Sequence, residues 1–281
     1  MNAVAAPARA ERVVVAEHAQ VTPTLIVRRA LPDAGLRAVG PWVFLDHFGP
    51  LDVEHGDGGT SPHPHAGIET VTYLFAGSMH HRDSLGHEGS VGPGGAQWMT
   101  AGRGIVHAER PGGGERLHGL QLWTKLPRAI QFAEPGYQNL LAKDLPSLRI
   151  GDADVRVVGG ELAGRASPAG TRSPLLLAHF AFAGAGRVEV AVPADFELAL
   201  YVAAGEARVR DVQAVTGTLV KLAHEGVVAF DVPGAADVML LGGTRLAEPL
   251  VFHGPFVMDS VAAIRQAERD FYAGNMGTLS A

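Results

Sequence analysis

The sequence of 281 residues contains no cysteine, which excludes disulfide bonds, zinc ribbons, thiolate-bound iron–sulfur clusters and thiol catalysis. It also has no uninterrupted apolar run approaching the roughly 18 residues of a membrane-spanning helix. Positive charge is scarce, because 23 Lys and Arg stand against 29 Asp and Glu for a formal net charge of −6. A polyanion-binding protein needs clustered positive charge. We therefore expect a soluble cytoplasmic protein that binds neither nucleic acid nor a membrane.

What the sequence has in quantity is glycine, proline and apolar residues. Its 36 Gly and 18 Pro separate short β-favouring runs, and its 47% of hydrophobic residues can form a sizeable core. This regular spacing is typical of a closed or sandwiched antiparallel sheet. The predicted strands include Thr24–Arg28, Trp42–Phe44, Thr70–Phe75, Gln97–Thr100, Gly119–Thr124, Val155–Val158, Arg187–Val192, Phe196–Ala203, Gly205–Val209 and Gly226–Val232.

The composition changes between Leu140 and Pro174 without a clean linker. We place the domain boundary after residue 145, so that residues 1–145 and 146–281 each form a small β-barrel. The N-terminal segment MNAVAAPARAERVVVA has no apolar core of secretory length, and we interpret it as a short frayed tail rather than a targeting peptide.

The C-terminal end has a different pattern. Ser260 is a residue that caps helices, and Val261, Ile264 and Ala267 follow it at helical spacing. Gly274 stands where such a helix would end. The sequence therefore predicts a short C-terminal helix.

Histidine is concentrated in the first half of the chain. Eight of the 13 histidines lie between His55 and His118, whereas only three scattered ones follow Arg149. Without cysteine, imidazoles and carboxylates would have to hold any metal, and only the first half has both in close groups. The eight are His55, His63, His65, His80, His81, His87, His107 and His118.

Two short segments in this region share one spacing. In His63-Pro64-His65 and in His107-Ala108-Glu109 the polar residues are two positions apart, so in a strand both would project to the same side. Pro64 cannot donate a ladder hydrogen bond, which favours the start or the edge of a strand. If the two segments face each other, opposed Cβ atoms lie about 4.5–5.5 Å apart and the side chains can converge on one cation. Three imidazoles and one carboxylate suit Fe(II), Mn(II), Ni(II) or Zn(II) and leave positions open for other ligands.

Long motifs around these segments resemble the pirin family of the cupin superfamily. They are GPWVFLDHFGP at Gly40–Pro50, SPHPHAGIETVTYLFAGSMHHRDSLGH, GAQWMTAGRGIVHAE, HGLQLW, FHGPFVM at Phe252–Met258 and AERDFYAGNMG. The resemblance covers nearly the whole chain. It implies an all-β bicupin, with two tandem cupin (double-stranded β-helix, or jelly-roll) barrels and the short terminal helix.

The resemblance also implies a single divalent metal in the N-terminal barrel, usually iron, with Mn, Ni, Zn or Co as alternatives. Its pattern places the ligands at His63, His65, His107 and Glu109. Cupins in general often use a carboxylate four residues after the second histidine, where this chain has Glu69. We favour Glu109 as the ligand and keep Glu69 as a rival or an outer residue. The C-terminal half has no His-x-His, so we expect it to be metal-free.

The activity implied by the resemblance is that of a quercetin 2,3-dioxygenase, which cleaves a flavonol with O2 and releases carbon monoxide. Glu109 would be the catalytic base, and a flavonol-like molecule and O2 the partners. The alternative is a metal-containing regulatory protein that binds a transcription factor or a metabolic enzyme. A third possibility is a structural metal with no open position.

The other polar side chains of the first half have simpler explanations. We expect His80 and His81 to be exposed, because they follow a turn. Turn hydrogen bonds would account for His47. His118 and Gln121 are an odd number of positions apart, so at most one of them lines a cavity.

Overall fold

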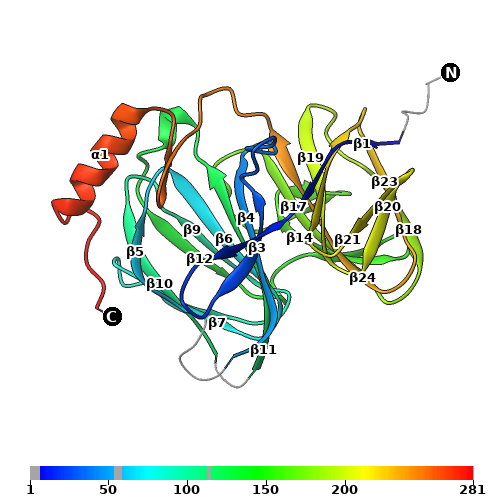
Figure 1. The fold of residues 1–281 in the computed structure, drawn as a ribbon, viewed down its shortest axis with the longest axis horizontal. Helices are drawn as coiled ribbons and strands as arrows, with labels where there is room; N and C mark the ends of the chain where they lie inside the picture. Colours follow the sequence, from blue (N-terminus) through cyan, green and yellow to red (C-terminus); the bar gives the residue numbers. More distant parts are fainter. Residues whose placement is uncertain (1–6, 54–58, 113–114, 281) are drawn as a thin grey trace. The chain divides into compact units, whose positions relative to one another are not determined.

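The structure, a computed structural model, describes residues 7–53, 59–112 and 115–280. Its regular elements in these residues are β-strands, one 3-10 turn and one α-helix, which confirms the predicted all-β class (Figure 1). The chain divides by contact into two compact units. The first takes the described residues of Met1–Glu17, Arg29–Trp42 and Lys143–Arg245, and the second those of His18–Arg28, Val43–Ala142 and Leu246–Ala281.

The first unit contains a seven-stranded and a four-stranded antiparallel sheet. The larger has the order β1 (Arg9–Val15), β22 (Thr218–Ala223), β19 (Phe196–Ala204), β24 (Ala236–Thr244), β17 (Leu175–Phe182), β14 (Ala153–Gly159) and β13 (Ser147–Ile150). The smaller has the order β18 (Gly186–Ala191), β23 (Val227–Val232), β20 (Glu206–Val209) and β21 (Val212–Val215). A further pair joins β15 (Glu161–Leu162) and β16 (Arg165–Ala166). The seven-stranded and the four-stranded sheet contribute to one apolar core, in which Phe180 and Phe230 meet edge to face.

Strand β1 corrects the interpretation of the N-terminal segment. Arg9–Val15 is not a frayed tail, because it pairs with β22, with Val13 opposite Val220. Val13, Val14 and Val15 are β-branched residues that favour the extended backbone. The strand thus lies at the edge of a sheet formed by residues more than a hundred positions downstream.

The second unit has the same two-sheet plan. Its seven-stranded sheet has the order β12 (Gly136–Leu140), β9 (Ala96–Thr100), β6 (Ile68–Ala76), β11 (Glu115–Lys125), β4 (Trp42–Val53), β3 (Ile26–Leu31) and β2 (Glu17–Gln20). Its four-stranded sheet has the order β5 (Thr60–His65), β10 (Ile105–Pro111), β7 (Met79–Asp83) and β8 (Glu88–Val91). Leu74 from the first sheet and Met79 and Val91 from the second share an apolar cluster. The two sheets therefore pack face to face, as in a cupin barrel.

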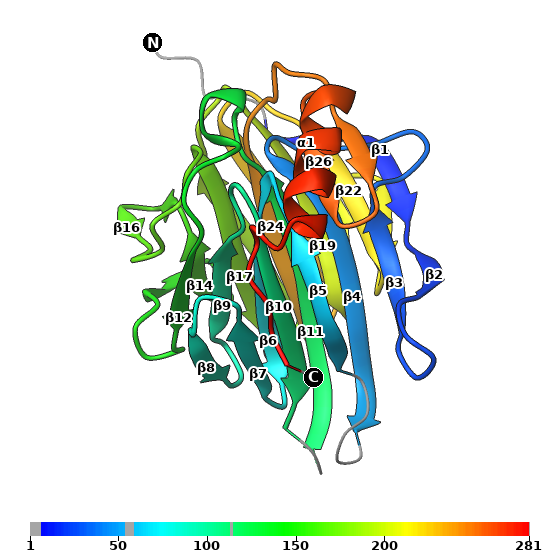
Figure 2. The same cartoon turned by 90° about the vertical axis from the view of Figure 1, so that its left-hand side faces the viewer.

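The C-terminal helix is confirmed. Helix α1 (Val261–Tyr272) begins at Ser260, whose hydroxyl accepts a hydrogen bond from the backbone N–H of Ala263. Its buried residues pack in one apolar cluster with the hairpin of β25 (Val251–His253) and β26 (Phe256–Met258). Figure 2 shows α1 beside β26. Ala66 and Val106 belong to the same apolar cluster, so the helix packs against the end of β5 and the start of β10.

The predicted strands agree with the structure with small shifts at their ends, except that Trp42–Phe44 is only the beginning of the 12-residue β4. Thr70–Phe75 lies within β6 and Gly119–Thr124 within β11, whereas Thr24–Arg28 is displaced towards β3. The turn between β11 and β12 contains the 3-10 helix η1 (Arg128–Ile130). The domain boundary after residue 145 stays a prediction. Among the described residues, no helix has the length and apolar character needed to span a membrane.

Candidate metal centre

Strands β5 and β10 bring the two predicted metal-binding segments together. They pair antiparallel, with His63 opposite His107 and His65 opposite Ile105. The register then shifts, so that Glu109 lies opposite Thr60. The side chains of His63, His65 and His107 meet on one side of this ribbon, as the alternation of strand side chains requires.

The three imidazoles form a compact cluster. Their ring centroids are 4.9 Å (His63 to His65), 4.4 Å (His63 to His107) and 5.1 Å (His65 to His107) apart. The Nε2 atoms of His63 and His107 lie 3.1 Å from each other. Two neighbouring ligand atoms at about 2.1 Å from a metal and about 90° apart are separated by about 3.0 Å. The spacing therefore matches adjacent positions on one cation.

Backbone carbonyls orient two of the rings. The Nδ1 of His63 is 2.9 Å from the Ser61 oxygen, and the Nδ1 of His65 is 2.9 Å from the Pro255 oxygen. A carbonyl can only accept, so each Nδ1 carries the hydrogen and each Nε2 keeps its lone pair. Metal-ligating histidines usually donate their second ring hydrogen in this way. Pro255 belongs to the β25–β26 hairpin, so the C-terminal segment helps to orient His65.

The buried histidines are held in their neutral, ligating form. Burial, and then the neighbouring His63, lowers the pKa of His65 to about 3, although the hydrogen bond to Pro255 opposes this. Burial and the nearby imidazoles lower the pKa of His107 well below its usual value. The buried Nδ1 of His107 has no hydrogen-bond partner among the described residues. Neutral imidazole is a common metal ligand, and the Nε2 atoms of His63 and His107 have the spacing of neighbouring ligands, so these residues fit a divalent metal.

Glu109 lies beside this cluster rather than within it. Its carboxylate belongs to a second group of possible ligands, in which the donor atoms of His81, His107 and Glu109 lie within 4.8 Å of one another. Oε1 of Glu109 accepts a hydrogen bond of 2.5 Å from the hydroxyl of Thr72. The structure thus assembles three of the four predicted ligands, and Glu109 is connected to them through His107.

Glu69 lies on the opposite face of its strand. Strand β6 directs Thr72 towards Glu109, whereas Glu69, three positions earlier, points to the other side. There its carboxylate accepts hydrogen bonds from Thr100 at 2.8 Å and from Thr124 at 3.4 Å. Glu69 belongs to neither group of possible ligands in the described residues.

Two amide substitutions test the choice of carboxylate. Glu109→Gln should weaken metal binding at least about 10-fold, because an amide oxygen carries no charge to offset that of the cation. Glu69→Gln should leave metal binding unchanged, since its amide oxygen still accepts from Thr100. The metal-to-protein ratio after dialysis against a chelator measures both. The opposite ranking would make Glu69 the ligand.

Family models and relatives identify the chain. Residues 24–124 match the model described as Pirin, and residues 177–277 match the Pirin C-terminal cupin domain. A pirin-like protein of Solanum lycopersicum is 35% identical over 257 residues, which cover 90% of this chain and 87% of the relative. The chain belongs to the pirin family. The predicted bicupin fold is thereby confirmed.

Solved structures agree with this assignment. A quercetin 2,3-dioxygenase of Acinetobacter baumannii matches with a TM-score of 0.90 and 27% identity, over 95% of this chain and 91% of that one. The bacterial pirin YhhW of Escherichia coli, in complex with nickel(II), matches with a TM-score of 0.67 and 20% identity, over 84% and 99% of the two chains. At that identity the second match supports the fold alone.

His81 is the site residue of this pirin family member that the sequence prediction missed. We expected His80 and His81 to be exposed, but His81 is only 2% exposed and lies near His107 and Glu109. His80 points outward, towards Ser90 and Glu88. The burial of His81 could have been predicted from Met79, because a large apolar residue two positions before His81 in a strand indicates that both side chains face the interior.

The remaining histidines lie apart from the candidate ligands. His47 is buried, and its Nε2 is 2.7 Å from the Nε2 of His118. His179 contacts Asp237 at 2.8 Å in the first unit. His55 lies outside the described residues. Both groups of possible ligands belong to the second unit, and the metal-free state of the C-terminal half stays a prediction.

Proposed function

We propose that this pirin family member is a metal-dependent dioxygenase that cleaves flavonols such as quercetin with O2. The observation that carries this proposal is the convergence of three histidine side chains beside the carboxylate of Glu109. The likeness to a quercetin 2,3-dioxygenase at 27% identity supports it. We propose Fe(II) as the resident metal, held by His63, His65, His107 and Glu109.

The metal and its histidine ligands would have separate roles. A divalent metal bound here supplies a Lewis acid that favours the anionic form of a hydroxyl group bound to it. Neutral imidazoles leave the positive charge of the metal available for this purpose. Because the carbonyls of Ser61 and Pro255 accept from the Nδ1 atoms of His63 and His65, their Nε2 atoms are left for the metal.

In this proposal Glu109 is the residue that receives the proton of the substrate. Thr72 occupies its Oε1, which leaves Oε2 for ligation or for accepting a proton. A carboxylate that takes the 3-hydroxyl proton of a flavonol acts as a general base, which typically contributes about 10²–10⁴-fold to a rate.

An aromatic wall beside His65 suits a flat substrate. The ring of Trp123 meets that of His65 edge to face at 4.8 Å, and Trp123 stacks on Phe44 at 4.0 Å. Trp123 and Gln121 project from the same face of β11, and Gln121 contacts Thr72 at 2.6 Å. The two aromatic rings thus lie next to the proposed base.

Turnover of a flavonol tests the proposal directly. The protein, loaded with Fe(II) under anaerobic conditions, should consume O2 on mixing with quercetin and bleach the flavonol absorption band. His63→Ala should reduce the rate to less than about a hundredth, because one ligand is lost. His80→Ala, which alters an outward-facing histidine on β7, serves as the control and should keep the activity.

The competing proposal is a metal-containing regulatory protein that binds a transcription factor or a metabolic enzyme. It predicts full metal occupancy and an unchanged absorption spectrum for every flavonol offered. That result would overturn the dioxygenase proposal while leaving the metal centre in place.

A further inference from the structure

Strand β10 carries two of the candidate ligands and has a neighbour on each side. Strand β5 brings His63 and His65 from one side, and β7 lies on the other. In the β10–β7 register His81 is opposite Glu109 and Asp83 is opposite His107. The proposed ligands of β10 are therefore flanked by histidines on both sides, although only those from β5 belong to the predicted set.

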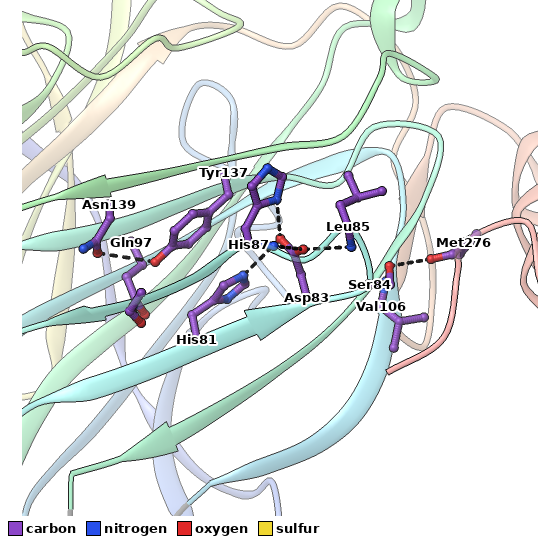
Figure 3. A network of polar contacts seen from close by, with 11 residues as sticks. His81, Asp83, Ser84, Leu85, His87, Gln97, Val106, Tyr137, Asn139 and Met276 are labelled. Atoms are coloured by element: carbon purple, nitrogen blue, oxygen red, sulfur yellow. Dashed lines mark hydrogen bonds and ion pairs between the residues drawn. The ribbon is translucent and has the colours of Figure 1, made fainter. Parts of the chain in front are cut away.

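The ring of His81 is fixed by its surroundings, as Figure 3 shows. Its Nε2 lies 3.3 Å from Oδ2 of Asp83. One face stacks on Tyr137, with a centroid distance of 4.3 Å and an interplanar angle of 8°. The His107 ring lies 5.4 Å away. A side chain that is 2% exposed and held in this way has one orientation.

Asp83 is itself anchored by a turn. Its Oδ1 accepts hydrogen bonds from the backbone N–H groups of Leu85 and His87 at 2.9 and 3.0 Å, and its Oδ2 is 2.9 Å from Nδ1 of His87. Burial alone would raise the pKa of Asp83, but the hydrogen bonds from His81, His87 and Leu85 lower it below its usual value. Asp83 is therefore a fixed carboxylate, and as an acceptor it requires the hydrogen of His81 to be on Nε2.

Asp83 orients the His81 ring by accepting its Nε2 hydrogen, and proteins orient histidines around a metal with a carboxylate in the same way. On the other side Thr72 holds Oε1 of Glu109. The Glu109 side chain is thus enclosed between Thr72 and His81. His81 thus lies between Asp83, which its Nε2 contacts, and Glu109, whose carboxylate is within 4.8 Å of a ring nitrogen of His81.

We propose that His81 is a positioning residue of the metal centre. From the β7 side it keeps Glu109 and His107 in the orientation that binds the cation, and Asp83 and Tyr137 keep its own ring in place. This inference rests on the proposed metal centre but not on the identity of the substrate.

Cobalt(II) alone is the probe, because its visible absorption bands report the geometry of its ligands. His81→Leu should weaken Co(II) binding about 10- to 100-fold and change the shape and intensity of these bands. His81→Gln, which keeps a polar group, should recover part of both effects, and Asp83→Asn should shift the bands in the same direction as His81→Leu. His80→Leu is the matched control, with an outward-facing histidine on the same strand, and should match the wild-type protein.

A wild-type dissociation constant and spectrum in His81→Leu would overturn the proposal. So would weaker binding with an unchanged spectrum and a lower melting temperature, because a purely structural role gives that result. If His81→Leu does not fold, the spectra of His81→Gln and Asp83→Asn decide in the same way.

The inference and the proposed function fail separately. Wild-type protein that binds Co(II) with the expected differences between variants, but leaves flavonols intact with Fe(II), contradicts only the dioxygenase. Flavonol turnover with variants that are indistinguishable from wild type contradicts only the role of His81. Wild-type protein that binds no divalent ion overturns both.

Discussion

His107→Ala should remove the metal from this pirin family member and abolish flavonol turnover with it. His107 is the one residue that the two groups of possible ligands share. Without it, His63 and His65 no longer share a group of possible ligands with Glu109, and two imidazoles alone are too few ligands to hold a metal. Bound metal per chain should fall to less than about a tenth of the wild-type value, measured by elemental analysis after dialysis.

Imidazole added to the His107→Ala protein provides a second measurement. The substitution leaves a space of the size of the lost ring at a side chain that is 1% exposed. Free imidazole that enters this space should restore part of the metal binding, which a merely misfolded variant would not show. His118→Ala, which removes another buried histidine, is the control and should keep its metal. Stoichiometric metal in His107→Ala would contradict the ligand set.

The two ligand segments could be predicted because their information is local. His63 and His65 are two positions apart, as are His107 and Glu109, and strand alternation alone places each pair on one side. The pairing of β5 with β10 then sets His63 opposite His107. Sequence spacing predicted the side of the strand, and the structure added the register shift that leaves Glu109 beside the cluster rather than within it.

Counting positions failed where a turn interrupts the strand. From His63 the even spacing to Glu69 suggests a shared face, but Gly67 lies between β5 and β6 with a φ of +79°. A Cβ at Gly67 would lie 2.3 Å from the oxygen of Val257, so the tight turn needs glycine. The alternation starts anew after this turn, and Glu69 points to the face opposite Thr72.

Contacts between distant segments could not be predicted from local patterns. The Pro255 oxygen that orients His65 is 190 positions away, and a backbone carbonyl has no sequence signature. The pairing of β1 with β22 could not be predicted either, because the valines of β1 favour a strand but do not specify its partner. These features follow from the topology of the fold.

Lys125 is a charged side chain in the interior of the second unit that the sequence analysis did not single out. It is 2% exposed, and its Nζ donates to the Leu126 oxygen and to Oε1 of Gln131, the latter at 3.1 Å. Gln131 in turn donates to Asp259 at 3.0 Å, next to the cap of helix α1. Burial lowers the pKa of Lys125 to about 8, although Asp259 and Glu248 oppose the shift.

The unfolding free energy should therefore depend on pH through Lys125. Below about pH 8 the folded protein keeps a buried ammonium that the unfolded chain exposes to water, which is unfavourable. Between pH 8 and the ordinary lysine pKa the unfolded state binds more protons than the folded state, so stability rises with pH. From pH 7 to pH 10 the contribution of Lys125 grows by about 2.5 kcal/mol.

Lys125→Met removes this contribution and keeps a side chain of similar length. Denaturant unfolding of wild type and variant from pH 7 to pH 10 should show the wild type gaining stability relative to the variant by that amount. Lys143→Met, at an exposed lysine, should follow the wild type at every pH. Parallel curves for Lys125→Met and wild type would mean that Lys125 titrates alike in the folded and unfolded states, and the buried charge would then have no part in the pH dependence of the fold.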